Sequence, residues 1–130
     1  MSIQKTLKER DTRYGVFAGH AQVTQDLKSV IRARSSDWAR LSKDQQEAID
    51  MILHKIGRII NGDPNYIDSW HDISGYATLV ENRLQNEQNT EKEKEISEKV
   101  LKGLAQADKN KFANKVLAQK KMIEEKSDGT

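Results

Sequence analysis

Residues 42–84, SKDQQEAIDMILHKIGRIINGDPNYIDSWHDISGYATLVENRL, decide the fold of this chain. Apolar side chains recur there at the i, i+3, i+4 and i+7 spacing of an amphipathic helix, first up to Ile60 and again up to Leu84. Ser42 and Gln45 have the spacing of a helix-capping box, which marks the start of the first helix. The pattern predicts two helices with a short link between them.

The link, residues 61–64 (NGDP), contains residues that end one helix and begin another. Gly62 suits the left-handed conformation that stops a helix. Asp63 can cap the following helix, and Pro64 suits its first position because the N–H that proline lacks would be unpaired there. Because so short a link makes the two helices antiparallel neighbours, we expect an antiparallel helical hairpin over residues 42–84.

The rest of the chain predicts an all-α fold in two parts, a core domain at residues 1–84 and a charged extension at residues 85–130. In the core domain we expect a short helix over residues 1–14, a break at Gly15 and Gly19, and a helix over residues 20–34. Residues 85–95 contain no apolar side chain. Residues 96–123 carry a narrow apolar stripe, typical of one or two surface helices that need a partner. That partner would be the hairpin, a second subunit or another protein.

Composition excludes several function classes. The net charge of +2 argues against a dedicated nucleic-acid interface, since such interfaces are strongly basic. The absence of cysteine rules out a disulfide scaffold and a thiol nucleophile. No apolar run is long enough to cross a membrane and none resembles a signal peptide, so we expect a cytoplasmic protein. The thin apolar content indicates a homodimer or a higher oligomer.

Polar residues share faces of the two hairpin helices at a spacing of four. They are Asp50, His54 and Arg58 on the first helix, and Asp68, Asp72 and Tyr76 on the second. Folding the hairpin about its link places Arg58 level with Asp68, and His54 level with Asp72 or His71.

This arrangement predicts a ligand site. Carboxylates one turn apart can share a hard cation, so Asp68 and Asp72, with Asp50, are candidate Mg²⁺ ligands. Phosphate would be bound by the basic side chains of Lys55, Arg58 and His54. Tyr14, Phe17 and Trp70 are candidates for stacking on a base. The alternative interpretation is structural: the charged residues would form salt bridges between the helices, and the aromatic residues would pack in the core.

The same region carries a resemblance to a known family. The residues that carry it are Tyr14-Gly15-x-Phe17, then His54-Lys55-Ile56-x-Arg58-Ile59, then Asp68-Ser69-Trp70-His71-Asp72-Ile73-x-Gly75-Tyr76. They resemble a family of small, largely uncharacterised phage and prophage proteins. This pattern is distantly similar to the MazG-like all-α nucleoside triphosphate pyrophosphohydrolases.

The distant resemblance implies a MazG-like helical bundle that uses Mg²⁺ to cleave a nucleotide between its α and β phosphates. The family's second acidic cluster resembles Asp68 with Asp72, which would be the catalytic pair, although their spacing is four rather than three. The first cluster is poorly matched, because His54 and Lys55 stand where acids would be useful. Basic side chains at these two positions remove metal ligands and favour direct binding of phosphate. This difference puts pyrophosphohydrolase activity in doubt.

These features lead to two hypotheses. The first is a phage-type protein that binds, and could hydrolyse, a nucleotide or nucleotide-derived small molecule at the hairpin. The second is a non-catalytic counter-defence protein that binds and inhibits a host protein through its helical surface or C-terminal helices. Nucleic-acid binding is a weaker third interpretation, supported only by three arginines near residues 32–40 and the lysines of the extension.

Overall fold

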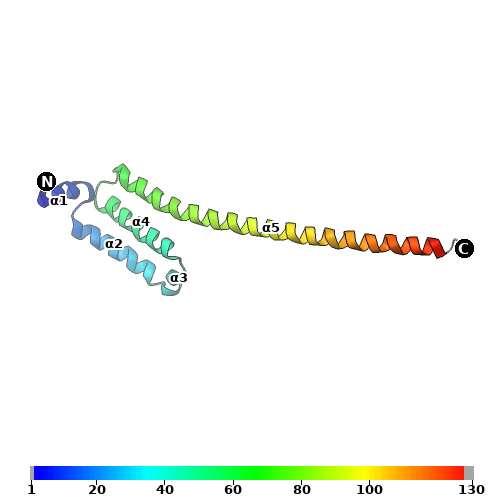
Figure 1. The fold of residues 1–130 in the computed structure, drawn as a ribbon. Helices are drawn as coiled ribbons and strands as arrows, with labels where there is room; N and C mark the ends of the chain where they lie inside the picture. The colour runs from blue at the N-terminus through cyan, green and yellow to red at the C-terminus, as the bar shows by residue number, and fades with distance from the viewer. Residues whose placement is uncertain (1, 128–130) are drawn as a thin grey trace. The chain divides into compact units, whose positions relative to one another are not determined.

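The structure is a computed structural model that describes residues 2–127, and these residues form helices joined by short turns, with no strand (Figure 1). The elements are α1 (Ile3–Tyr14), α2 (Phe17–Arg32), α3 (Ser35–Ala39), α4 (Lys43–Asn61) and α5 (Ile67–Ser127). The prediction of an all-α protein is confirmed. The chain divides into two compact units, residues 1–84 and residues 85–130, and α5 contributes to both.

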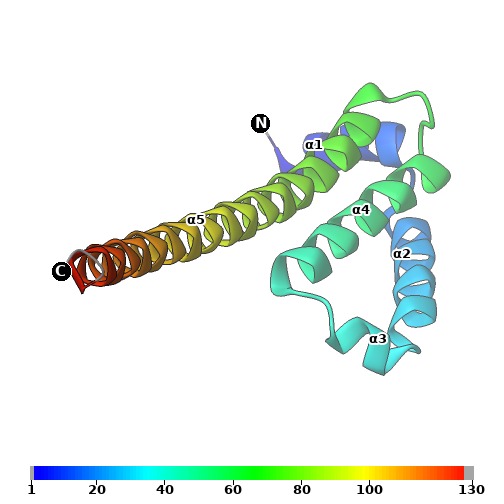
Figure 2. The same cartoon turned by 90° about the vertical axis from the view of Figure 1, so that its right-hand side faces the viewer.

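The first unit is built on the contact between α2 and α4, which lie side by side with α3 at one end (Figures 1 and 2). Gly57 of α4 permits the close approach, since a Cβ atom there would lie 3.0 Å from the ring of His20 on α2. Ala48 and Leu53 are the only buried hydrophobic residues in the described part of the chain. The core of this unit is therefore thin.

The junction of α1 and α2 is fastened to the end of α4. Gly15 has a φ of 73°, a conformation that side chains other than glycine rarely adopt. Nδ2 of Asn61 donates to the carbonyl oxygens of both Tyr14 and Val16 at 2.9 Å. The predicted break at Gly15 is confirmed, whereas the predicted break at Gly19 is wrong because α2 already begins at Phe17.

The start of α4 agrees with its sequence signal and its end does not. Ser42 caps the helix, and its backbone N–H donates to Oε1 of Gln45 at 2.9 Å, which confirms the capping box. Gly62 has a φ of −124°, so the predicted left-handed conformation is wrong. A glycine is required there for another reason, because a Cβ atom would collide with the backbone of Arg13 and Tyr14.

The helix α5 begins at Ile67, three residues later than Pro64. Oδ1 of Asp63 accepts from the backbone N–H of Asn65 at 2.9 Å, so Asp63 stabilises a turn instead of capping the helix. The carbonyl oxygen of Pro64 accepts from Nε1 of Trp70 at 2.8 Å, which ties this turn to the first part of α5. The predicted cap at Asp63 and helix start at Pro64 are therefore wrong.

Two ion pairs set the register of α4 and the first part of α5. Nζ of Lys55 lies 2.8 Å from Oδ2 of Asp72. Asp44 pairs with Arg83, and these two residues lie eleven positions before Lys55 and eleven positions after Asp72. The two helices are therefore antiparallel, in agreement with the short link between them. Between the ion pairs an apolar groove of about 270 Å³ remains open, lined by Leu41, Gln45, Ala48, Ile49, Ile52, Ala77 and Val80.

The second unit is a single helical segment as far as it is described, since α5 continues without a break to Ser127. The sequence left open whether this region forms one helix or two. Every described side chain of residues 85–127 is exposed. Among the described residues, no helix combines the length and apolar character needed to cross a membrane.

Candidate functional site

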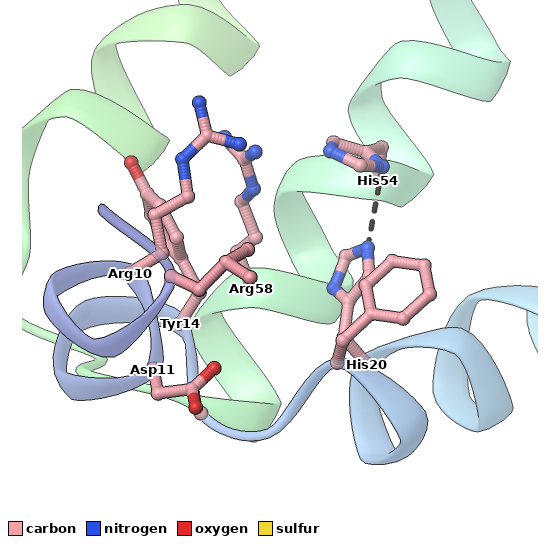
Figure 3. Close-up of a pocket in the computed structure, with 9 residues that line it drawn as sticks. Arg10, Asp11, Tyr14, His20, His54 and Arg58 are labelled. Atoms are coloured by element: carbon pink, nitrogen blue, oxygen red, sulfur yellow. Dashed lines mark hydrogen bonds between the residues drawn. The ribbon is translucent and has the colours of Figure 1, made fainter. Parts of the chain in front are cut away.

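A cavity of about 250 Å³ lies in the first unit where α1, the first turns of α2 and the middle of α4 meet (Figure 3). The shape of the cavity depends on the junction of α1 and α2 that Asn61 holds in place, because lining residues precede and follow this junction in the chain. The lining residues are Leu7, Arg10, Asp11, Tyr14, Gly15, Phe17, His20, His54 and Arg58. The cavity combines apolar walls with several charged and polar groups, which is the usual character of a small-molecule site.

Arg58 is held in place by an aromatic ring. Its guanidinium carbon lies 4.1 Å from the ring centroid of Tyr14, within the range of a cation–π contact. Tyr14 is fixed in turn by an edge-to-face contact with Tyr66, at 5.9 Å between centroids. The guanidinium of Arg58 is therefore positioned by the protein before any ligand arrives.

Arg10 supplies a second guanidinium from α1. In the close-up the side chains of Arg10 and Arg58 extend in the same direction, and the ring of Tyr14 lies with them (Figure 3). Asp11 is the one carboxylate among the lining residues. Two guanidinium groups in one cavity favour an anionic ligand, and their planar fork matches a phosphate or a carboxylate.

A pair of histidines forms the opposite wall. Nε2 of His20 lies 3.2 Å from Nδ1 of His54, and the two rings meet edge to face at 4.6 Å (Figure 3). Oγ1 of Thr24 lies 3.4 Å from the same nitrogen of His20. His20 is 6% exposed, and its Nδ1 atom has no hydrogen-bond partner within the described structure. This nitrogen is buried beside Gly57 of α4, where a Cβ atom would lie 3.0 Å from it.

Both histidines are neutral at pH 7. Burial, followed by the nearby charge of Arg58, lowers the pKa of His54 from 6.5 to about 4. The same two causes, in the same order, lower the pKa of His20. The positive charge of the cavity therefore comes from the arginines, while the imidazoles offer neutral hydrogen-bonding groups.

The structure divides the residues predicted for phosphate binding between two places. His54 and Arg58 line the cavity, and His54 faces His20 instead of Asp72 or His71. Lys55 is only 8% exposed and lies in the contact with α5, where it pairs with Asp72. The structural interpretation, a salt bridge between helices, therefore applies to Lys55.

The three predicted Mg²⁺ ligands have separate partners. Asp50 accepts from Nη2 of Arg32 at 3.0 Å, Asp68 accepts from the hydroxyl of Tyr66 at 2.9 Å, and Asp72 pairs with Lys55. Across residues 2–127 there is no group of three or more histidine, aspartate or glutamate side chains that could hold a metal ion. The structure therefore does not bring these carboxylates together, and the Mg²⁺-binding and catalytic roles predicted for them stay predictions.

The three predicted stacking residues also separate. Tyr14 and Phe17 line the cavity, and Phe17 is 75% exposed. Trp70 lies outside the lining, and its indole N–H is bound to the carbonyl oxygen of Pro64. Tyr14 already has one face covered by Arg58, so Phe17 is the aromatic surface that a ligand can reach.

Sequence reasoning missed Arg10 and His20 as site residues. Arg10 could have been found, because Leu7, Arg10 and Tyr14 share one face of α1 at helical spacing, beside the aromatic residues. His20 could not, because its role depends on a histidine 34 positions away on another helix.

The chain matches no protein-family model, no curated protein and no solved structure. Its function is therefore inferred from the chemistry of the cavity.

Proposed function

We propose that the chain binds a nucleotide or a nucleotide-derived small molecule in the cavity between α1, α2 and α4. The observation that carries the proposal is the pair of guanidinium groups, Arg10 and Arg58, in an aromatic-walled cavity. The volume of about 250 Å³ is close to the lower end of small-molecule sites, which begin near roughly 300 Å³. It suits the phosphate and sugar of a nucleotide, with the base at the rim.

The phosphate would bind the two arginines. Arg58 is already oriented by its contact with Tyr14, so little side-chain freedom is lost when a ligand binds. Arg10 lies on a different helix from Arg58. The two guanidinium groups would therefore bind different oxygens of one phosphate, or two neighbouring phosphates.

The base would stack on Phe17. This side chain is exposed although it is large and apolar, and it stands beside the histidine pair at 6.2 Å from the ring of His20. Base–aromatic stacking contributes about 1–3 kcal/mol. The neutral imidazoles of His20 and His54 could then hydrogen-bond polar atoms of the base or sugar without attracting a further anion.

The sequence resemblance supports the same ligand class. Tyr14, Phe17, His54 and Arg58 belong to the pattern shared with phage proteins and, distantly, with MazG-like enzymes, and all four line the cavity. The cavity holds one acid, Asp11, and no cluster of metal-ligating side chains among the described residues. The proposal is therefore limited to binding by a phage-type protein, and hydrolysis stays a prediction of the sequence.

A thermal-shift panel tests this proposal. Ribo- and deoxyribonucleoside mono-, di- and triphosphates, cyclic dinucleotides, the free nucleosides and inorganic pyrophosphate are each mixed with the full chain. Binding to the native state raises the melting temperature by mass action. We expect a rise with at least one nucleotide class and a smaller rise with the matching nucleoside. No rise across the panel would contradict the proposal.

A second candidate function is supported by a different observation. Large apolar side chains are exposed on α1, on α2 and on the first turn of α5, namely Leu7, Phe17, Ile67 and Trp70. Exposed apolar patches mark protein-interaction surfaces. We propose, as the alternative, a counter-defence protein that binds a host protein at this surface. Host-protein binding that is lost in Trp70→Asp, together with an empty nucleotide panel, would favour this alternative.

A further inference from the structure

Asp11 is the one charged residue of the cavity lining that phosphate binding does not use. Its side chain forms no hydrogen bond and no ion pair within residues 2–127. Leu7 and Gly15, which lie four positions before and after it, have no group that could pair with a carboxylate. A carboxylate repels a phosphate, so Asp11 is available to a part of the ligand that donates hydrogen bonds.

The carboxylate of Asp11 lies apart from the two guanidinium groups. Arg10 and Asp11 are neighbours on α1, so their side chains leave the helix about 100° apart. In the close-up the guanidinium groups of Arg10 and Arg58 lie at the top of the view, and the carboxylate of Asp11 lies near the bottom (Figure 3). A ligand with a phosphate at one end and hydrogen-bond donors at the other matches this separation of charge.

Asp11 and Phe17 are the exposed residues on the two sides of the junction of α1 and α2. Asp11 is exposed near the end of α1, and Phe17, at the start of α2, is 75% exposed. Both line the cavity, so both lie at its rim. Because the phosphate of a bound nucleotide lies with the arginines, the base is the part that reaches Asp11 and Phe17.

The nucleobases differ in what their Watson–Crick edges offer to a carboxylate, which only accepts hydrogen bonds. Guanine presents two neighbouring donors, the N1–H and the exocyclic amine. Adenine and cytosine each present an amine beside a ring nitrogen that accepts, and uracil and thymine present one N–H between two carbonyl oxygens. A carboxylate can form two charge-assisted hydrogen bonds with guanine, whereas it is brought against an acceptor on each of the other edges.

We propose that Asp11 selects guanine as the base of the nucleotide bound in the cavity, by accepting hydrogen bonds from its N1–H and its exocyclic amine. This inference rests on the proposed nucleotide binding and adds the identity of the base. Arg10 and Arg58 bind the phosphate, Phe17 stacks on the base, and Asp11 binds the edge of the base.

Calorimetric titration of the full chain with GDP, ADP, inosine diphosphate and xanthosine diphosphate tests the inference. These ligands differ only in the base, and each offers one phosphate group to each arginine. Hypoxanthine lacks the exocyclic amine of guanine, so we expect inosine diphosphate to bind about tenfold more weakly than GDP, the lower end for a hydrogen bond to a charged group, because Asp11 is exposed. ADP and xanthosine diphosphate should bind more weakly still.

Equal affinities for GDP and ADP would overturn the selection of guanine and leave the proposed nucleotide binding intact. If none of the four ligands binds, the selection of guanine is overturned, and the thermal-shift panel then shows whether nucleotide binding is overturned with it.

Asp11→Asn tests the residue itself. An amide donates one hydrogen bond and accepts another, which matches xanthine, where a carbonyl oxygen replaces the exocyclic amine. We expect the affinity for GDP to fall about tenfold and that for xanthosine diphosphate to rise. Glu9→Gln removes a carboxylate of the same helix that is outside the lining, so it should leave the order of the four affinities unchanged.

The melting temperature of each variant without ligand shows that it is folded. An Asp11→Asn variant that is folded and keeps the affinity for GDP would overturn the inference, and so would a Glu9→Gln variant with the same change in preference as Asp11→Asn.

Discussion

Nδ1 of His54 lies 3.2 Å from Nε2 of His20, across the contact between α4 and α2. In this contact one nitrogen donates a hydrogen and the other accepts it. Protonation of both rings would remove the acceptor and add two positive charges near Arg58, whose own charge already disfavours the protonated imidazoles. The pair is therefore compatible with the fold only while it is largely neutral.

The first prediction is a loss of stability between pH 6.5 and pH 4. In this range the unfolded chain binds protons at His54 and His20 more readily than the folded chain, because folding lowers both pKa values and lowers that of His54 to about 4. The free energy of unfolding should be level above about pH 6.5 and fall as the pH decreases. Melting curves at several pH values measure this. His54→Gln should reduce the dependence of the melting temperature on pH. His71→Gln, which replaces an exposed histidine, should leave this dependence unchanged. Equal melting temperatures at pH 7.5 and pH 4.5 would contradict the prediction.

The second prediction concerns the thin core. Leu53 is 7% exposed and is the larger of the two buried hydrophobic residues among residues 2–127. Leu53→Ala removes buried methyl groups and leaves a cavity, so it should lower the free energy of unfolding by about 2–4 kcal/mol. Leu79→Ala, at an exposed leucine of α5, should cost less than about 1 kcal/mol. Urea denaturation compares the two variants, and similar losses would show that Leu53 is not a core residue in solution.

The third prediction separates the two partners of the ion pair between α4 and α5. Lys55 is 8% exposed, whereas the side chain of Asp72 is 41% exposed, and Lys55 holds the pKa of Asp72 below its usual value. Asp72→Asn leaves a buried ammonium group unpaired, so it should lower the melting temperature more than Lys55→Met does. If Asp72→Asn instead left the melting temperature unchanged and abolished nucleotide binding, Asp72 would belong to the ligand site, as the sequence alone predicts.

The fourth prediction compares two glycines on helices. A Cβ atom at Gly57 would lie 3.0 Å from the ring of His20 and closer still to Oγ1 of Thr24, while a Cβ atom at Gly75 would meet nothing within 4 Å. Gly57→Ala should therefore destabilise the chain by about 1–3 kcal/mol through overpacking. Gly75→Ala should stabilise it by about 0.5–1 kcal/mol, because alanine favours the helix. Thermal or urea unfolding measures both changes, and a stabilising Gly57→Ala would show that α2 and α4 do not approach so closely.

Local signals in the sequence were sufficient to predict much of the fold. The start of α4 depends on Ser42 and Gln45, which interact within one turn, so their spacing was enough. Gly62 was misjudged because the reason for a glycine there is a close contact with α1, 48 positions earlier in the sequence at Tyr14. The start of α5 was misplaced because Asp63 bonds a neighbouring backbone N–H, a local choice that the sequence does not distinguish from helix capping.

Several residues of the candidate site could be predicted from the sequence, but which of the predicted residues lie together could not. Tyr14, Phe17, His54 and Arg58 were identified from spacing and resemblance, and the structure places them around one cavity. Lys55 shares a spacing pattern with Arg58, yet it pairs with Asp72 on α5. Which of two helices a long side chain reaches depends on tertiary packing, and periodicity along one helix does not contain that information.

Isothermal titration calorimetry tests the central claim most directly. The nucleotide that gives the largest thermal shift is titrated into the full chain, into Arg58→Ala, and into Arg40→Ala, which removes the same charge outside the cavity lining. A charge-assisted hydrogen bond contributes about 1.5–3 kcal/mol, which corresponds to a loss of affinity of about 10- to 100-fold. We predict a loss of this size for Arg58→Ala and nearly unchanged affinity for Arg40→Ala. Equal affinity in the unmodified chain and in Arg58→Ala would place the nucleotide outside this cavity and contradict the claim.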